Sequence, residues 1–462
     1  MTTRLAKLSS RFVEGGWLPP TKEAHAAFLK KLISDTDKHK EHLSFERADR
    51  DAITTAVLEF RNFIIRDADM FMGFNRMFEQ SPDDTGIRNF DHFIQCLNYV
   101  LHNAPTFGHF GPPLYMILFR AMDTQGGFTA FLADKLNERF KILLNLWSQF
   151  LDSPASTNVL NDEEGGWFHT DAVYAVTSDY TTADGQVMPF DAIFQSDLSK
   201  PYWGFTSWDD YFNREFVTEA KPGFPLPRPV GIPPPEPFSD DIIGGACESV
   251  LYNIQKDVKR NDAFWIKGEP YSLEHMLRPS LYTILGYDDI VAPFVGGTVL
   301  QGFLQVTGYH RWAAPVSGRI VKIVDVPGTY FVQSPAWLPG EEAREESDLD
   351  PNDPANHPYV RSLAFITSLT ARQLIFIESS NERIGLMCFI AIGMTEVSSC
   401  QATVREGQMV QRGDELGMFH FGGSSHALIF RAGVDIIWFD DPQDGDLIKV
   451  RSAIGGVKKV PV

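Results

Sequence analysis

The hydrophobic pattern of this chain changes at a proline-rich segment. This change restricts the possible folds more than any other feature of the sequence. From residue 22 to about residue 155, apolar residues recur at the spacing of amphipathic helices, as in Phe128 to Leu151. The segment KPGFPLPRPVGIPPPEP, Lys221 to Pro237, is kept extended by its prolines and ends this pattern. Short alternating runs with glycine and proline between them follow, which is typical of a compact, mostly antiparallel sheet or barrel. These runs are SVLYNI, TVLQGFLQV, GRIVKIVDV, RQLIFIES and IGLMCFIAIG.

The sequence therefore predicts an α+β protein with three parts. We expect an N-terminal helical domain over 1–160, a connecting segment with the proline-rich linker over 161–237, and a mostly antiparallel β domain over 238–462. The helical domain has no glycine-rich phosphate motif. We therefore expect either a packed domain without a catalytic role of its own or a cap that gates substrate or binds a partner. The acidic segment Leu338 to Pro358 is expected to be a solvated surface loop, with a mobile lid as the alternative.

Charge and cysteine content exclude several classes of protein. The 462 residues carry a net charge of −19, which repels phosphate backbones, so nucleic acid is not an expected partner. Cys96, Cys247, Cys388 and Cys400 are too scattered for a disulfide framework or a zinc cluster, so we expect reduced thiols and no metal site. The sequence shows neither a signal-peptide core nor the ~20 apolar residues of a transmembrane helix, which favours a cytoplasmic protein. The sequence leaves open whether the protein forms a homo-oligomer.

The stretch FGGSSHALIF, Phe421 to Phe430, places two glycines and two serines inside the pattern of a buried strand. Glycine in a strand marks either a β-bulge or a backbone that another group approaches closely. The serine-hydrolase motif G-x-S-x-G is absent, because His426 follows the serines and no third glycine is present. A biotinyl or lipoyl carrier would need a lysine at a hairpin tip, and no lysine lies between Lys322 and Lys449.

Four further segments carry a family resemblance. They are WDDYFNREF from Trp208, KGEPYSLEHML from Lys267, TGYHRWAAPVSGRIVKIVDVPGTYF from Thr307 and GQMVQRGDELGMFHFGGSS from Gly407. In this order they resemble the pyruvoyl-dependent phosphatidylserine decarboxylase family, and the resemblance covers residues 200–462. The N-terminal half, with GGWLPP at Gly15 and FGHFGPPLYMILF at Phe107, is similar to the fungal L-tryptophan decarboxylase branch of that family. Ordinary phosphatidylserine decarboxylases lack this helical extension.

The resemblance implies that the chain cleaves itself between Gly423 and Ser424. In this family the serine hydroxyl attacks the preceding carbonyl, and a glycine without a side chain lets it approach closely. An N-to-O acyl shift and a β-elimination then turn the serine into a covalent pyruvoyl cofactor. The products would be a β chain over 1–423 and an α chain over 424–462, which stay together because their strands share one core.

A pyruvoyl group implies the decarboxylation of an amino acid. Its ketone forms a Schiff base with the substrate amine and withdraws the electrons that CO2 leaves behind, a role that pyridoxal phosphate has elsewhere. The N-terminal resemblance, the acidic surface and the absence of a membrane segment favour a small aromatic L-amino acid such as tryptophan, in secondary metabolism. Two alternatives stay open, namely phosphatidylserine as the substrate and an unprocessed, non-catalytic homologue that binds or scaffolds.

The residues that would activate Ser424 depart from the family pattern. The family's relay joins a carboxylate, a histidine and the serine. Glu248, in the stretch ACES, takes the place of the family's aspartate and is either the relay carboxylate or a surface residue. His310 matches the first histidine of the family's His-Arg-x-His, but Ala313 replaces the second, which resembles the relay base.

The alanine at position 313 leaves three outcomes. His310 serves both cleavage and decarboxylation, or His426, on the same strand face as Ser424, replaces the missing base, or the chain does not process itself. His426 is otherwise a structural histidine.

Two residues after His310 are candidates for substrate binding. Arg311 pairs either with a substrate carboxylate or with a structural partner, and Trp312 follows it. His275 and His420 carry no comparable signal, and no metal-ligand constellation is visible.

Overall fold

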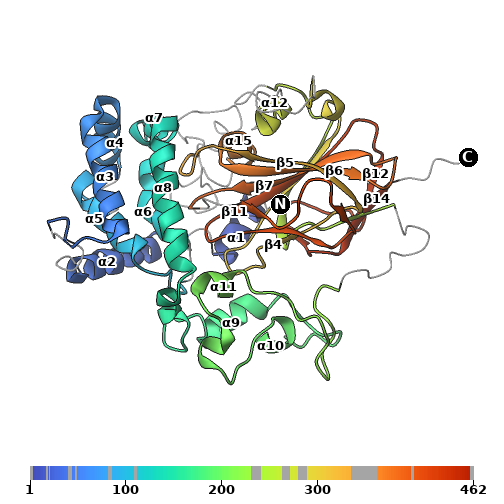
Figure 1. Ribbon diagram of the computed structural model, residues 1–462, viewed down its shortest axis with the longest axis horizontal. Helices are drawn as coiled ribbons and strands as arrows, with labels where there is room; N and C mark the ends of the chain where they lie inside the picture. The colour runs from blue at the N-terminus through green and yellow to red at the C-terminus, as the bar shows by residue number, and fades with distance from the viewer. Residues whose placement is uncertain are drawn as a thin grey trace, which may run out of the picture.

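The computed structural model describes residues 4–457 apart from 17–18, 20, 40–43, 47–48, 82–85, 109–111, 230–240, 263–270, 279–288, 334–361 and 397–399. It confirms the α+β fold, with a helical region followed by a largely antiparallel β domain (Figure 1). The acidic segment 338–358 and the proline-rich segment from residue 230 lie outside the described residues. The predicted surface loop and the predicted domain boundaries therefore stay predictions.

Helices dominate the chain before residue 152. They are α1 (Arg4–Glu14), α2 (Lys22–His39), α3 (Ala52–Arg66), α4 (Ala68–Gln80), α5 (Phe90–Leu101), α6 (Pro113–Met122), α7 (Gln125–Phe131) and α8 (Asp134–Leu151). Their starts follow local chemistry, because the side chains of Asp51, Asp67 and Asn89 accept hydrogen bonds from the first turns of α3, α4 and α5. Two prolines, Pro112 and Pro113, begin α6.

Phenylalanine rings fill the space between these helices. Phe60 of α3 lies 6.2 Å from Phe74 of α4 and 5.0 Å from Phe140 of α8, measured between ring centroids. Phe131 of α7 lies 6.1 Å from Phe140. The helical stretch that the sequence predicts from residue 22 to about 155 is therefore a packed bundle with an aromatic core.

A connecting region of short elements follows the bundle. It contains the 3₁₀-helices η2 (Pro154–Val159) and η3 (Pro201–Gly204) and the helices α9 (Thr170–Thr177), α10 (Phe190–Ile193) and α11 (Trp208–Phe212). Figure 1 shows this region in green, below both the bundle and the sheet. The hydroxyl of Ser207 accepts from the N–H of Asp210 and caps α11, whose aromatic side chains are buried.

The strands form three antiparallel sheets in the described part of the chain. The strands are β1 (Ile242–Gly244), β2 (Ser249–Lys256), β3 (Thr298–Phe303), β4 (Arg311–Ala313), β5 (Gly318–Val326), β6 (Arg372–Ser379), β7 (Leu386–Gly393), β8 (Cys400–Ala402), β9 (Met409–Val410), β10 (Glu415–Phe419), β11 (Ser424–Phe430), β12 (Ile436–Trp438), β13 (Leu447–Ile448) and β14 (Ala453–Val457). Eight of them make the main sheet, in the order β13-β2-β3-β11-β7-β6-β5-β9, and the others form the sheets β1-β14-β12 and β4-β10-β8. Three short helices, η6 (Ala292–Phe294), α12 (Leu273–Leu277) and α15 (Leu363–Leu369), lie between strands in the sequence.

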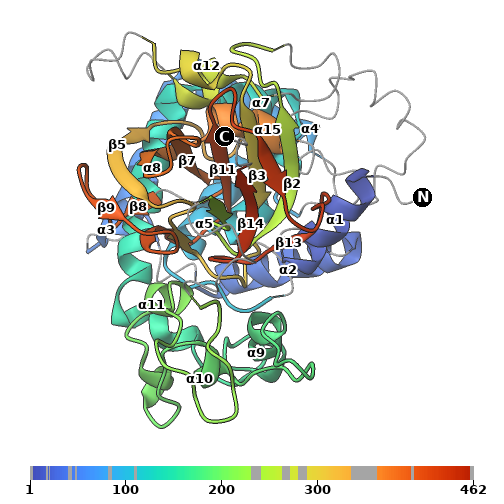
Figure 2. The same cartoon turned by 90° about the vertical axis from the view of Figure 1, so that its right-hand side faces the viewer.

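Strand β11 lies inside the main sheet rather than at an edge. It pairs with β3 through residues 425–430 and with β7 through residues 424–430, both antiparallel (Figure 2). All seven of its residues are buried. The five apolar runs of the sequence are confirmed as β2, β3, β5, β6 and β7.

The helical region and the β domain share one hydrophobic core. Phe331, which follows β5, packs against Phe140 of α8 with ring centroids 4.9 Å apart. At the other end, Phe12 of α1 stacks on Phe303 of β3 at 4.0 Å, and the N–H of Val306 donates to the carbonyl of Gly15 at 2.9 Å. The N-terminal segment with its two glycines therefore lies against the end of β3, next to β11.

Candidate active site

The turn before β11 is held by backbone hydrogen bonds. Gly422 has φ 134°, a conformation that side chains disfavour, so the first glycine is required by the backbone. The N–H of Gly423 donates to the carbonyl of Thr395 at 2.7 Å, and its carbonyl accepts from the N–H of Met394 at 2.8 Å. The carbonyl of Ser424 accepts from the N–H of Leu304 at 2.9 Å. The Gly423–Ser424 peptide is thus fixed between the ends of β7 and β3.

The hydroxyl of Ser424 is buried and makes no hydrogen bond to the described residues. The residue has no exposed surface, and its Oγ has no hydrogen-bond partner within the described chain. A buried hydroxyl without a partner is costly and therefore uncommon in folded proteins. A nucleophile aimed at a neighbouring backbone carbonyl would have this environment before it reacts.

His426 lies two residues further along β11, on the same face as Ser424. Its Nε2 lies 2.9 Å from the hydroxyl of Ser249, and its Nδ1 has no partner in the part of the chain described. Burial lowers the pKa of His426 to about 3, so the imidazole is neutral near pH 7. In the tautomer in which Nε2 donates to Ser249, Nδ1 is the nitrogen that can accept a proton.

His310 precedes β4 and stacks on Phe212 of α11 with ring centroids 4.0 Å apart. Its carbonyl accepts from the N–H of Phe419, in the strand that leads into the glycine turn. Neither ring nitrogen has a hydrogen-bond partner among the described residues. Burial, and then the charge of Arg214, lower the pKa of His310 well below its usual value. His310 is therefore a neutral imidazole with both nitrogens free to exchange a proton.

Glu248 is buried in an ion pair. The guanidinium of Arg228 donates to both of its oxygens, with Nε at 2.9 and 3.1 Å, and the N–H of Val450 donates at 2.9 Å. The N–H of Ala313 donates to the carbonyl of Ala246 at 2.8 Å. Ala313, at the position of the family's second histidine, is therefore bonded to the segment that carries Glu248, but the Glu248 carboxylate pairs with an arginine.

Arg311 is surrounded by protein partners. Its guanidinium donates to the carbonyl of Asn213 at 2.8 Å and forms ion pairs with Glu215 at 3.1 Å and Glu415 at 2.8 Å. These contacts match the alternative in which Arg311 pairs with a structural partner and not with a substrate carboxylate. The side chain of Trp312 points into the core, where its ring lies 4.9 Å from that of Phe419.

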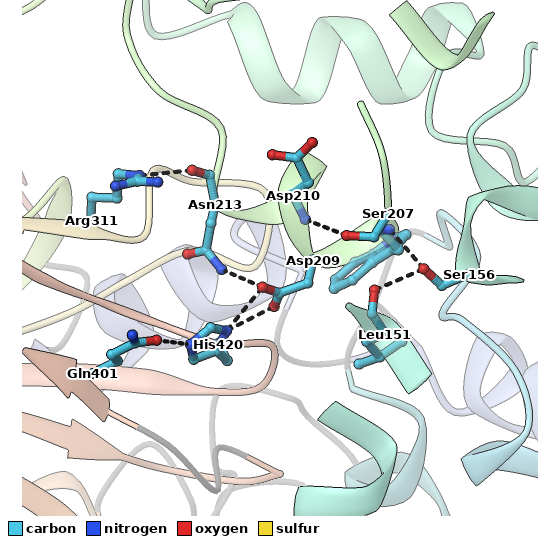
Figure 3. Close-up of polar contacts among 10 residues, drawn as sticks. Leu151, Ser156, Ser207, Asp209, Asp210, Asn213, Arg311, Gln401 and His420 are labelled. Atoms are coloured by element: carbon cyan, nitrogen blue, oxygen red, sulfur yellow. Dashed lines mark hydrogen bonds and ion pairs between the residues drawn. The ribbon is translucent and has the colours of Figure 1, made fainter. Parts of the chain in front are cut away.

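A carboxylate–histidine pair that the sequence did not predict lies beside the turn. Figure 3 shows His420 between Asp209 and Gln401, with Nδ1 2.9 Å from Asp209 Oδ2 and Nε2 2.6 Å from the Gln401 side-chain oxygen. Although burial disfavours the charged ring, the hydrogen bond and charge of Asp209 hold the pKa of His420 above its usual value. The pair joins α11 to the end of β10. A histidine just before the glycines was the only hint that the sequence offered.

Phe421 connects the turn with three aromatic side chains. Its ring lies 5.4 Å from Trp147 of α8, 4.6 Å from Trp208 and 5.4 Å from Phe212 of α11. Because Phe212 also stacks on His310, the histidine and the turn border one apolar cluster. Such a cluster excludes water from the backbone next to Ser424.

A second missed residue is Glu396, which is buried two residues after Met394. A lone acidic residue at the end of the apolar run IGLMCFIAIG was the available signal. The described residues contain no group of three or more His, Cys, Asp or Glu that could hold a metal ion. None of the described helices combines the length and apolar character needed to span a bilayer.

Known proteins are similar in sequence to this chain along most of its length. Family models described as phosphatidylserine decarboxylase match residues 54–176 and 232–456. The L-tryptophan decarboxylase of Psilocybe cubensis is 38% identical over 453 residues, which is 96% of this chain and 94% of that protein. The L-tryptophan decarboxylase of Psilocybe cyanescens is 39% identical over 452 residues, with the same coverage of 96% and 94%.

A more distant relative matches a smaller part of the chain. Phosphatidylserine decarboxylase proenzyme 3 of Schizosaccharomyces pombe is 27% identical over 278 residues, which is 58% of this chain and 24% of that protein. With both family models matched in sequence order, and with relatives aligned from end to end, this chain is a decarboxylase that belongs to the phosphatidylserine decarboxylase family.

Proposed function

We propose that the chain cleaves itself between Gly423 and Ser424 and then acts as a pyruvoyl-dependent decarboxylase of an aromatic L-amino acid, with tryptophan as the leading substrate. The observation that carries the proposal is the buried Ser424 hydroxyl, which lacks a partner and follows a glycine carbonyl held by the N–H of Met394. The two full-length relatives are named L-tryptophan decarboxylases, which supports the substrate class.

Self-cleavage would proceed by attack of Ser424 Oγ on the carbonyl carbon of Gly423. The hydroxyl proton passes to a base, the C–N bond breaks, and the serine nitrogen takes up a proton, which leaves an ester. Loss of the Ser424 α-proton then expels the Gly423 carboxylate, and addition of water with release of ammonia leaves the pyruvoyl group. Negative charge on the carbonyl oxygen would be stabilised by the Met394 N–H, a hydrogen-bond donor already in place.

His310 is the better-supported base for this step. It is neutral, and both of its ring nitrogens are free in the described structure, whereas the Nε2 of His426 is engaged by Ser249. His310 therefore takes the double role of proton acceptor in cleavage and proton donor in turnover, with His426 as the second candidate. The carboxylate of Glu248 supports neither, because it is paired with Arg228.

The residues around Ser424 fit a pyruvoyl group because the position is buried, is preceded by glycines and lies on the same strand face as His426, whose Nδ1 has no partner among the described residues. When present, the keto group would accept the amine of the substrate and draw off the electrons released with CO2. The aromatic cluster of Trp208, Phe212 and Phe421 would keep water away, which favours loss of a carboxylate from an apolar place.

Phosphatidylserine is the second candidate substrate. Both family models are those of phosphatidylserine decarboxylase, and the sequence match with the Schizosaccharomyces pombe proenzyme extends over more than half of this chain.

Intact-mass measurement of the purified full-length protein tests self-cleavage. We expect two fragments, 1–423 and 424–462, with the smaller one blocked at its N-terminus and reactive with hydrazine. Ser424→Ala should give one chain of 52.0 kDa without activity. Ser425→Ala is the matched control and should still be cut, because its hydroxyl lies on the other face of β11. A wild-type protein that stays uncut would support the non-catalytic alternative.

Activity assays then separate the substrates. Incubation with L-tryptophan should release tryptamine and CO2, while vesicles containing phosphatidylserine should give no phosphatidylethanolamine. The opposite result would make phosphatidylserine the substrate and leave the self-cleavage proposal standing.

A further inference from the structure

Glu396 has an unusual backbone and surroundings. It is 2% exposed, and its φ of 61° lies in the left-handed region that residues other than glycine rarely adopt. Such a conformation persists only where the surrounding structure holds it. The contacts of its side chain show what holds it.

The carboxyl group of Glu396 meets the helical region. Its Oε1 accepts from the N–H of Tyr115 at 2.7 Å, in the first turn of α6. Its Oε2 is buried and has no hydrogen-bond partner within the described chain. Burial raises the pKa of Glu396 to about 8, in spite of the N–H groups of Tyr115 and Leu114, so the group is a neutral acid near pH 7.

The two residues before Glu396 hold the bond that would be cut. Met394 donates its N–H to the carbonyl of Gly423, and Thr395 accepts the N–H of Gly423. Because Glu396 directly follows these two residues, a restraint on its position limits how far both contacts can shift. The hydrogen bond to Tyr115 thus connects α6 to the N–H that faces the carbonyl under attack.

We propose that Glu396 is a positioning residue for self-cleavage, which ties the start of α6 to the Met394–Thr395 backbone and so fixes the N–H that polarises the Gly423 carbonyl. The inference rests on the proposed self-cleavage and extends it, because it makes the helical region part of the cleavage site. The helices then do more than cover the sheet, since a contact between chain segments 281 residues apart sets the geometry of the reacting peptide.

Four precursors made by cell-free translation test this role, with the cut fraction followed over time on a gel. Glu396→Gln keeps a neutral side chain of the same length with an oxygen for the Tyr115 N–H, and it should be cut within about twofold of the wild-type rate. Glu396→Gly keeps the φ of 61° accessible but removes the link, and it should be cut ~10²-fold more slowly, as expected for a misplaced reacting group. Glu396→Asp, one methylene shorter, should be slow for the same reason.

Circular dichroism of each variant in the Ser424→Ala background checks that the variant folds. If Glu396→Gly does not fold, the cleavage rate of Glu396→Asp tests the positioning role instead. A glycine or aspartate variant that folds and is cut at the wild-type rate overturns the inference and leaves self-cleavage intact. A glutamine variant as slow as the glycine variant also overturns it, because the amide preserves the link. A wild-type chain that is never cut contradicts the proposed function itself.

Discussion

Ser424 and Ser425 are neighbours on one strand but have opposite environments. Ser425 Oγ donates to the carbonyl of Gly302 at 3.0 Å and accepts from Gln301 Nε2 at 3.0 Å. The same Gln301 donates to Thr367 and accepts from the hydroxyl of Tyr271, at 2.8 and 2.7 Å. Ser424 Oγ faces the other side of the sheet and has no partner in the described residues. Alternation along a strand thus gives one serine a structural role and leaves the other free to react.

The histidines divide in the same way. His310 and His426 are neutral, and among the described residues they have ring nitrogens without a hydrogen-bond partner. His420 has both nitrogens within hydrogen-bond distance of side-chain oxygens, and the hydrogen bond and charge of Asp209 hold its pKa above the usual value although burial opposes this. The two neutral imidazoles can therefore exchange a proton, whereas both ring nitrogens of His420 already have partners.

At neutral pH the largest predicted difference in stability concerns the two serines. In the Ser424→Ala background, which stays one chain, adding Ser425→Ala should lower the free energy of unfolding by ~1–3 kcal/mol, because Gln301 and the Gly302 carbonyl lose a buried partner. Urea unfolding of the single and double variants measures the difference. Equal midpoints would show that the Ser425 network is not stabilising and would remove the contrast.

The buried histidines predict acid sensitivity. Their folded pKa values lie below the unfolded value, so the unfolded chain binds protons first as the pH falls below about 6.5, and stability drops by up to ~1.4 kcal/mol per pH unit for each histidine. For His426 this loss continues down to a pH of about 3.

Unfolding of Ser424→Ala between pH 6.5 and 5, with and without His426→Gln, measures this slope. The glutamine variant should have the shallower slope. Identical slopes would mean that His426 is not buried as a neutral ring.

The smallest effect is expected at Asp209, and its sign is opposite. The raised pKa of His420 stabilises the fold fully below about pH 6.5, and this contribution is lost as the pH rises through the folded value. Asp209→Asn should therefore cost about 1 kcal/mol at pH 6 and less at pH 9. Thermal unfolding at the two pH values checks this, with Asp210→Asn on the exposed side of α11 as the control. An equal loss of stability at both pH values would show that Asp209 and His420 do not form a charged pair.

Patterns within a few residues predicted the fold and the glycine turn, and the family resemblance supplied the proposed cleavage position. Long-range pairing escaped both. An apolar run identified β11 as a buried strand, and two glycines before a serine identified the turn. The partner of Glu248 is Arg228, which belongs to a proline-rich stretch without periodic structure. Asp209 and His420 lie 211 residues apart, and Glu396 and Tyr115 lie 281 apart. No local rule encodes which of many polar side chains meet across such distances.

The central position of β11 has a consequence for the life of the molecule. A cut before Ser424 would leave its new end in the middle of a sheet, bonded on both sides to β3 and β7 of the larger fragment. The uncut chain can bring these strands together as one polymer, but two separated fragments would have to meet in solution, so their recovery would depend on concentration. Such a protein would assemble once, as a precursor, and denaturation after maturation would be largely one-way.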